Sequence, residues 1–359
     1  MMNLMLPPIR FPLTVLLFLC LTHVATSADE FVSLPKQQLR TWTSRGGNFT
    51  VEATLLEVKS DAVLLNRQDN GKTITVQIEK LSAEDQAYLQ QFVSQPVASG
   101  IFLSLSGQTV KFGLSKENVI AVLGKPQRQE ISMFGLEWFV YHADYTKFMM
   151  IAFSDNTVCG LYTNAKGFRC GNGIEYGGTS EGTPIQDVDA TVFRDQDADN
   201  TAHAVLLIST KHRGRENATS PTFLAVQARE CFDATNAFRV NHGRKPLTWD
   251  NAAALTATKH SRDMATNNYF SHTSQDDRSM TDRFAEVSQR KWNACGENIA
   301  AGNVYGISAF DGWVNSPGHR ENMLNDQFQY LGVGSGYHSD SDYRYYMTQL
   351  FMAFFDHQK

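Results

Sequence analysis

The sequence predicts a multidomain protein of the α+β class. At 359 residues the chain is longer than a typical single domain. Its hydrophobic fraction of 42% and charged fraction of 19% are ordinary for globular proteins. Alternation of apolar and polar residues, the pattern of strands, recurs in the first 210 residues, whereas helical spacing recurs from Ala228 onward. These observations predict two or three domains built from both helices and strands.

The amino terminus has the features of a secretory signal. Arg10 precedes the apolar run Phe11–Leu21, and the small residues Ala25 and Ser27 follow it. The apolar run is too short to span a bilayer, and Ala-x-Ser fits a cleavage site. We therefore expect residues 1–27 to be a signal peptide, with an uncleaved anchor as the alternative. Since no later run reaches spanning length, we expect a secreted, periplasmic or cell-envelope protein without a transmembrane span after cleavage.

Charge and cysteine content restrict the partners and the covalent structure. The net charge of −5 gives no electrostatic reason to expect nucleic acid or anionic lipid as a partner. Four cysteines follow the predicted cleavage site: Cys159, Cys170, Cys231 and Cys295. In an oxidising compartment this even number predicts two disulfides, with three pairings open. The alternative is four buried free thiols.

Residues 38–92 form the first predicted domain. Three segments in it alternate apolar and polar residues, as half-buried strands do. Asn70-Gly71 separates the last two and indicates a hairpin turn, and Ser82 is placed to cap a short helix. The predicted strands are Leu55–Lys59, Ala62–Asn66 and Thr73–Ile78.

Three short patterns in this domain resemble a known family. They are Arg40-Thr-Trp-Thr, Gly46-Gly47 and the closing Leu-Ser-x-x-Asp at residues 81–85. Together they resemble the Sla-homology domain, a small SH3-like β-barrel. The resemblance implies a protein or peptide partner for this domain. We expect Trp42 in the hydrophobic core rather than in a binding groove.

Residues 101–210 form a second predicted domain, after a linker over residues 94–103. One helix is predicted in it, with Ser115 as its cap and Gly124 directly after its end. The predicted strands are Thr109–Phe112, Leu136–Tyr141, Phe148–Phe153 and Val158–Tyr162. The pattern from Gly113 to Pro126, with Trp138-x-x-Tyr141, resembles the CAP-associated domain, which implies a mixed α/β fold. The aspartates at 195, 197 and 199 fail the calcium-loop pattern, so we expect a solvated turn there.

Residues 228–356 are predicted to contain three helices followed by strands. The helices are Ala228–Val240, a second one capped by Asp250, and a third over Ile307–Trp313; the tail from Tyr330 is strand-like. Three runs carry a resemblance: His260–His272, Cys295–Ala300 and Trp313–Leu324. Their order and spacing resemble the bacterial branch of the CAP superfamily. That resemblance implies a carboxy-terminal α-β-α sandwich.

The resemblance also implies a binding cleft. In the family two histidines and two glutamates converge there, and the matching residues are His272, Glu297 and His319, whereas the second glutamate position holds Ser316. Two imidazoles and one carboxylate suit Zn²⁺ or another divalent metal and leave one position open. The alternative is a hydrogen-bonded cluster that holds loops together. The other polar residues of the runs are expected to be architectural: His260 packed, Asn298 a turn cap, and Arg320 and Asn322 bound to backbone carbonyls.

Three functions remain open. The favoured one is an extracellular binding module that holds a metal or small ligand in the cleft without turnover. A hydrolase is the alternative, either with zinc on His272 and His319 and Glu297 as ligand or base, or with Ser316 as nucleophile, His319 as base and Glu297 as orienting group. The third is an envelope interaction protein whose amino-terminal barrel binds a peptide.

Overall fold

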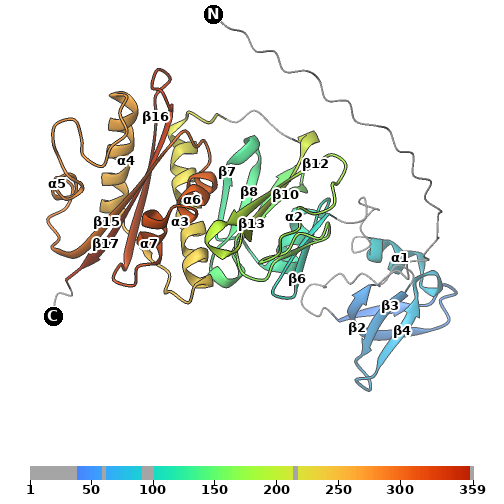
Figure 1. Cartoon of the computed structure of the whole chain (residues 1–359). Coiled ribbons are helices and arrows are strands. Elements are labelled where there is room, and N and C mark those ends of the chain that lie inside the picture. The colour runs from blue at the N-terminus through green and yellow to red at the C-terminus, as the bar shows by residue number, and fades with distance from the viewer. Residues whose placement is uncertain (1–38, 59–61, 91–100, 213–216, 356–359) are drawn as a thin grey trace, which may run out of the picture.

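The computed structural model describes residues 39–58, 62–90, 101–212 and 217–355 (Figure 1). Each of the three regions contains both helices and strands, so the chain is of the mixed α+β type. The predicted signal peptide, residues 1–27, lies outside the described residues. Within them, no helix combines the length and the apolar character needed to cross a membrane.

The amino-terminal module is a four-stranded antiparallel sheet with one helix. Its strands pair in the order β1-β2-β3-β4, and the Asn70-Gly71 turn between the last two confirms the predicted hairpin, with Gly71 at φ 64°. Within the described residues the first and last strands are not paired, so a closed barrel stays a prediction. The elements are β1 (Leu39–Thr43), β2 (Thr50–Val58), β3 (Ala62–Arg67), β4 (Thr73–Gln77) and α1 (Ala83–Gln90).

Asp85 explains why this module ends in the Leu-Ser-x-x-Asp pattern. Its buried carboxylate accepts hydrogen bonds from the Thr43 backbone N–H at 2.7 Å and from the Arg40 guanidinium at 3.0 Å. The Ser82 hydroxyl accepts from the Asp85 backbone N–H at 3.1 Å, which confirms the predicted cap. Trp42 is 1% exposed and donates to the Ala53 carbonyl, so its predicted core position is confirmed.

The middle region contains two sheets and one helix. The strand order is β12-β13-β10-β9-β8-β7 in the larger sheet and β11-β5-β6 in the smaller one. The predicted helix is confirmed as α2 (Lys116–Leu123), and Ser115 caps it. The four predicted strands are confirmed as β6, β8, β9 and β10, whereas β5, β7, β11, β12 and β13 were missed. The strands are β5 (Phe102–Leu105), β6 (Gln108–Lys111), β7 (Arg128–Ile131), β8 (Glu137–Tyr141), β9 (Met149–Ser154), β10 (Thr157–Thr163), β11 (Arg169–Cys170), β12 (Val188–Asp195) and β13 (Thr201–Ser209).

The carboxy-terminal region is a three-layer arrangement. Its sheet has the order β14-β16-β17-β15; α4 packs on one face, and α3, α6 and α7 pack on the other (Figure 1). The helices are α3 (Pro221–Asn241), α4 (Asn251–Thr266), α5 (Met280–Ala285), α6 (Gly306–Val314) and α7 (Pro317–Leu324). The strands are β14 (Thr248–Trp249), β15 (Trp292–Ala301), β16 (Tyr330–Tyr337) and β17 (Tyr345–Phe354).

The first helix of this region starts earlier than predicted. It begins at Pro221 rather than Ala228, because the Ser220 hydroxyl accepts from the Phe223 N–H at 3.1 Å and Pro221 suits the first helical turn. The predicted cap of the second helix is confirmed, since Asp250 accepts from the Ala253 N–H at 2.8 Å. The sequence analysis missed α5, α7, β14 and β15.

Three alternate glycines explain how closely α4 lies on the sheet. Gly332, Gly334 and Gly336 share one face of β16 because side chains alternate along a strand. A Cβ at Gly334 would lie 2.1 Å from the backbone nitrogen of Thr258 in α4. The helix backbone therefore rests directly on the strand.

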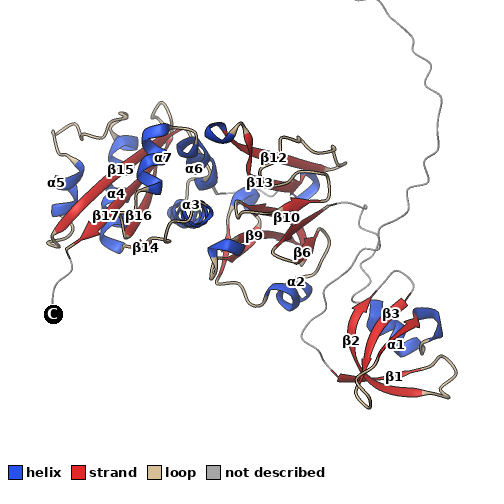
Figure 2. Cartoon of the chain, turned by 60° about the horizontal axis from the view of Figure 1, so that its bottom comes forward, coloured by secondary structure: helices blue, strands red, loops and turns tan. Residues whose placement is uncertain are grey.

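A continuous hydrophobic core joins the middle and carboxy-terminal regions, and Figure 2 shows α3 between their sheets. Polar contacts reinforce this junction. Asp233 of α3 is 1% exposed and pairs with the Arg128 guanidinium at 2.7 Å, and it accepts from the Tyr145 hydroxyl at 2.9 Å. The Asn164 side chain donates to the Ala234 carbonyl at 2.8 Å.

Glu230 is a buried carboxyl group in this junction, and it leads to a pH-dependent prediction. Its carboxyl oxygens are buried, and the polar side chains that act on them are those of Ser132 and Gln227. Burial, and then the charge of Glu130, raises its pKa well above the ordinary value. The folded protein therefore binds this proton more tightly, so the free energy of unfolding falls as pH rises from the ordinary to the raised pKa.

We expect Glu230→Gln to remove this loss of stability. Relative to the parent, the variant should gain stability as pH rises above the ordinary glutamate pKa, because glutamine has no proton to lose. Urea unfolding of both proteins at a series of pH values measures the difference. Parallel stability curves for parent and variant would contradict the raised pKa.

The four cysteines are free thiols in the structure, so the two predicted disulfides are not formed there. Three of the thiols are buried, as in the second alternative, whereas Cys295 is half-buried. Burial raises the pKa of Cys159 and of Cys170 to about 12, and it also raises the pKa of Cys231 and Cys295. Thiols with such raised pKa values are poor nucleophiles.

Candidate metal and ligand site

The structure brings two of the three predicted site residues into direct contact. Glu297 lies in β15 and is 9% exposed, whereas His272 is exposed in the loop between α4 and α5. The Nδ1 atom of His272 lies 2.9 Å from Glu297 Oε1. In neutral His272 the Nδ1–H donates to the carboxylate, so the lone pair is on Nε2.

Arg283 of α5 holds this pair in place, and the sequence analysis missed it. Its guanidinium donates to Glu297 Oε2 at 2.7 Å and to the His272 carbonyl at 2.9 Å. It also donates to the Ser274 hydroxyl and the Arg278 carbonyl. One buried cation therefore neutralises Glu297 and fixes the His272 loop. The capping box of Ser279 and Asp282 was the sequence signal that could have placed α5 and hence Arg283.

His260 supports the same loop from α4. It is fully buried, and its Nε2 lies 3.0 Å from the Ser271 carbonyl, to which it donates. Burial lowers its pKa to about 4, and Glu297, 3.9 Å away, opposes that effect. The imidazole is therefore neutral near pH 7, and its predicted role as a packed histidine is confirmed.

His319 lies in α7 and is half-buried. Its Nδ1 lies 2.9 Å from the Ser316 hydroxyl. Burial lowers the pKa of His319, and the charge of His272 lowers it further, so the two imidazoles are electrostatic neighbours. When Nδ1 donates to Ser316, the lone pair of His319 is on Nε2. Ser316 occupies the N-cap position of α7, but its hydroxyl contacts His319 instead of capping the helix.

A buried amide network connects His319 to the sheet. Asn298 lies inside β15, where its side-chain amide donates to the His319 carbonyl at 3.0 Å and to Gln349 Oε1 at 2.9 Å. Its predicted role as a turn cap is therefore wrong. The Asn322 side chain donates to Asn298 Oδ1 at 2.9 Å and to the Glu297 carbonyl. Two neighbouring residues of β15 thus position the two histidines: Glu297 contacts His272, and Asn298 contacts His319.

The turn that carries Ser316 is also held from the middle region. Arg320 forms a two-pronged ion pair with Asp195 at 2.9 and 3.0 Å, and both side chains are largely buried. Asn315 accepts from the Gln196 N–H and donates to the Arg194 carbonyl, both at 2.9 Å. Asp195 is therefore buried in an ion pair, and the predicted solvated turn is wrong for this residue. Arg320 donates to the Val314 carbonyl, as predicted, and in addition to the Asp195 carboxylate.

This geometry defines what the site can do chemically. Both oxygens of Glu297 are engaged, whereas the Nε2 atoms of His272 and His319 have no hydrogen-bond partner in the part of the chain that the structure describes. There, no cluster of three or more His, Cys, Asp or Glu side chains is arranged to hold a metal ion. Glu297 contacts His272 and not His319, so the described hydrogen bonds do not complete a Ser316–His319–Glu297 relay.

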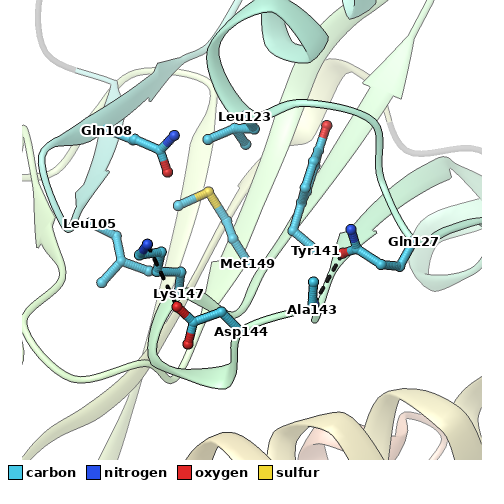
Figure 3. Close-up of a pocket in the computed structure, with 9 residues that line it drawn as sticks. All are labelled: Leu105, Gln108, Leu123, Gln127, Tyr141, Ala143, Asp144, Lys147 and Met149. Atoms are coloured by element: carbon cyan, nitrogen blue, oxygen red, sulfur yellow. Dashed lines mark hydrogen bonds and ion pairs between the residues drawn. The ribbon is translucent and has the colours of Figure 1, made fainter.

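A separate pocket of about 210 Å³ lies in the middle region (Figure 3). Leu105, Leu123 and Met149 contribute apolar surface to it. Its polar side chains already have partners: Lys147 pairs with Asp144, and the Tyr141 hydroxyl donates to the Gly124 carbonyl. None of the predicted site residues lines this pocket.

Family models match three parts of the chain. Residues 232–351 match the cysteine-rich secretory protein family, CAP. Residues 112–183 match the CAP-associated N-terminal family, and residues 33–96 match SLA1 homology domain 1.

Similar proteins come from Bacillus. The uncharacterized membrane protein YlbC of Bacillus subtilis (strain 168) is 30% identical over 286 residues, which cover 65% of this chain and 82% of YlbC. The uncharacterized protein YkwD of the same strain is 31% identical over 156 residues, 44% of this chain and 58% of YkwD.

A solved structure agrees with these matches. It is an extracellular protein containing a SCP domain from Bacillus anthracis str. Ames, with 28% identity and a TM-score of 0.56 over 67% of this chain and 93% of that one. The chain therefore belongs to the CAP family and carries a CAP-associated domain and an SLA1 homology domain ahead of its CAP domain.

Proposed function

We propose that this protein is a binding module acting outside the cytoplasm, whose histidine site, His272 and His319, holds a divalent metal such as Zn²⁺ or a small ligand. The observation that carries the proposal is a pair of Nε2 atoms without a partner among the described residues, on imidazoles whose Nδ1 atoms are already engaged. Imidazole nitrogens are preferred zinc ligands, and a carboxylate behind a histidine fixes its orientation.

Glu297 takes the orienting role in this proposal rather than that of a third ligand. Its carboxylate is held between His272 Nδ1 and the Arg283 guanidinium, and its side chain is 4% exposed. Direct coordination would require it to leave a buried ion pair, which is costly. Two imidazoles leave further coordination positions to water or to a ligand group, which suits binding.

The location outside the cytoplasm has two supports. One is the signal-like segment at residues 1–27. The other is the similarity to the Bacillus anthracis protein, which is described as extracellular. Hydrolysis is the less favoured alternative, because the Ser316–His319 contact lacks an orienting carboxylate among the described residues.

Zinc addition is expected to raise the melting temperature of the full chain, because a ligand that binds only the folded state stabilises it. Chelator should reverse the rise, and His272→Ala or His319→Ala should abolish it. Glu297→Gln should weaken zinc binding by roughly 10- to 100-fold, as loss of an orienting partner does. His338→Ala is the control: it alters a histidine in the loop after β16 and should keep the rise in melting temperature with zinc. An unchanged melting temperature with zinc in the parent protein would reject the metal site.

We also propose that residues 38–92 close into an SH3-like barrel that binds a protein or peptide partner. Its hydrophobic core is separate from that of the rest of the chain, which supports independent folding. A fragment of residues 28–95 is therefore expected to recover the same envelope partner as the full chain in a pull-down. Recovery by the full chain but not by the fragment would contradict this role.

A further inference from the structure

A pocket of about 230 Å³ lies between α3 and α4 at the outer edge of β16. We call it the edge groove. Its apolar wall includes Leu224 of α3 and Leu255 of α4, and its polar lining includes Arg229, Arg262 and Ser335. We propose that the edge groove binds an extended peptide in which an apolar residue adjoins an aspartate or glutamate.

The sheet edge explains why the occupant is an extended chain. Strand β14 pairs with β16 only at Tyr330 and Leu331, and no other described strand covers this edge beyond Leu331. The Leu331 carbonyl accepts from the Asp250 N–H on the outer side. Because backbone groups alternate along a strand, the N–H and C=O groups of Val333 and Ser335 face the same side. A peptide strand can add to such an edge.

Ser335 supplies a polar group that has no role within the fold. Its side chain is 6% exposed, and its hydroxyl oxygen has no hydrogen-bond partner among the described residues. The neighbouring Thr258 hydroxyl already donates to the Ala254 carbonyl at 2.8 Å. A buried hydroxyl without a partner is unfavourable, so a ligand that hydrogen-bonds Ser335 gains affinity.

Charge selects an acidic occupant. Arg229 lies 3.5 Å from the ring centroid of Trp249, and Arg262 is exposed on α4. No ion pair of 4 Å or less joins either guanidinium to a carboxylate in the described part of the chain, and no aspartate or glutamate lines the groove. The charges of Asp233 and Glu130 already act on Arg229, so Arg262 supplies the main attraction. A cation beside an apolar wall complements a carboxylate next to an apolar side chain. Leu255, 49% exposed, provides apolar surface for that side chain.

Selection of peptides against the full chain tests the proposal. The probe is a random heptapeptide library displayed on phage, followed by synthesis of the enriched peptides. We expect enrichment of sequences with an acidic residue beside an apolar one. Arg262→Gln should weaken their binding roughly tenfold through loss of a charge-assisted contact. Ser335→Ala should weaken it roughly fivefold through loss of a hydrogen bond, with a melting temperature no lower than that of the parent.

Matched controls separate the possible outcomes. Arg244→Gln removes an exposed arginine that pairs with Asp326 away from the groove, and it should leave peptide binding unchanged. N-methylation of alternate peptide amides should abolish binding if the peptide adds as a strand. The proposal is overturned if no acidic sequences are enriched, or if the groove variants bind like the parent. Binding of phosphatidylglycerol vesicles that depends on Arg229 and Arg262, without peptide enrichment, would also overturn it and assign the groove to lipid.

Discussion

Gly334→Ala is expected to lower the free energy of unfolding by about 3 kcal/mol or more, since overpacking against a rigid neighbour is strongly destabilising. The added Cβ would lie 2.1 Å from the backbone nitrogen and 2.4 Å from the Cα of Thr258. These are helix backbone atoms, so α4 as a whole would have to move away from β16. Gly332 and Gly336 approach the same helix as closely, which prevents a local adjustment. Urea unfolding followed by circular dichroism measures the loss.

Gly312→Ala is the matched control. Gly312 lies in α6, it is exposed, and a Cβ there would meet no atom within 4 Å. Alanine at this position should stabilise the protein by up to about 1 kcal/mol through its helix propensity. Equal effects of the two substitutions would contradict the close packing of α4 on the glycine face of β16.

Asp195→Ala is expected to cost about 3 to 5 kcal/mol, the usual effect of removing one partner of a buried ion pair. The substitution leaves Arg320, whose side chain is 14% exposed, with only the exposed Asp197 as a carboxylate partner. It also removes a contact that ties α7 to the middle region, so the turn that carries Ser316 should become more mobile. Thermal unfolding of the full chain measures the change in stability.

Asp197→Ala provides the comparison for this prediction. Asp197 lies 3.4 Å from the same arginine, but its side chain is 55% exposed. Exposed ion pairs contribute less than about 1 kcal/mol, so this variant should unfold close to the parent protein. If Asp195→Ala were as mild as Asp197→Ala, the junction between the two regions would not depend on the Arg320 pair.

Local signals predicted much of the fold. The helix caps at Ser82, Ser115 and Asp250 act within three residues of their partners, so the sequence alone contains them. Strand β15 was missed because Gly296–Ile299 are all buried, and helices on both faces of the sheet remove the apolar–polar alternation. The start of α3 was missed because its first turn depends on Ser220 and Pro221, ahead of the apolar pattern.

The candidate site could be predicted only through the family resemblance. His272 and Glu297 are 25 residues apart, and nothing in that spacing indicates their contact. Arg283 belongs to none of the three motif runs, and only the folded structure places its guanidinium on Glu297. The Asp195–Arg320 pair joins residues 125 apart in different regions, so its aspartate was assigned to a solvated turn. Contacts of this kind arise from tertiary packing, which local patterns do not encode.

The histidine site is tested most directly by locating zinc in crystals of the full chain through anomalous scattering at the zinc edge. The proposed geometry predicts one peak within about 2.1 Å of the Nε2 atoms of His272 and His319, the usual zinc–imidazole distance. Glu297 should remain bound to Arg283 and to His272 Nδ1. A peak at another site, or no peak at saturating zinc, would contradict the proposed metal site and leave the cluster as a hydrogen-bonded support for its loops.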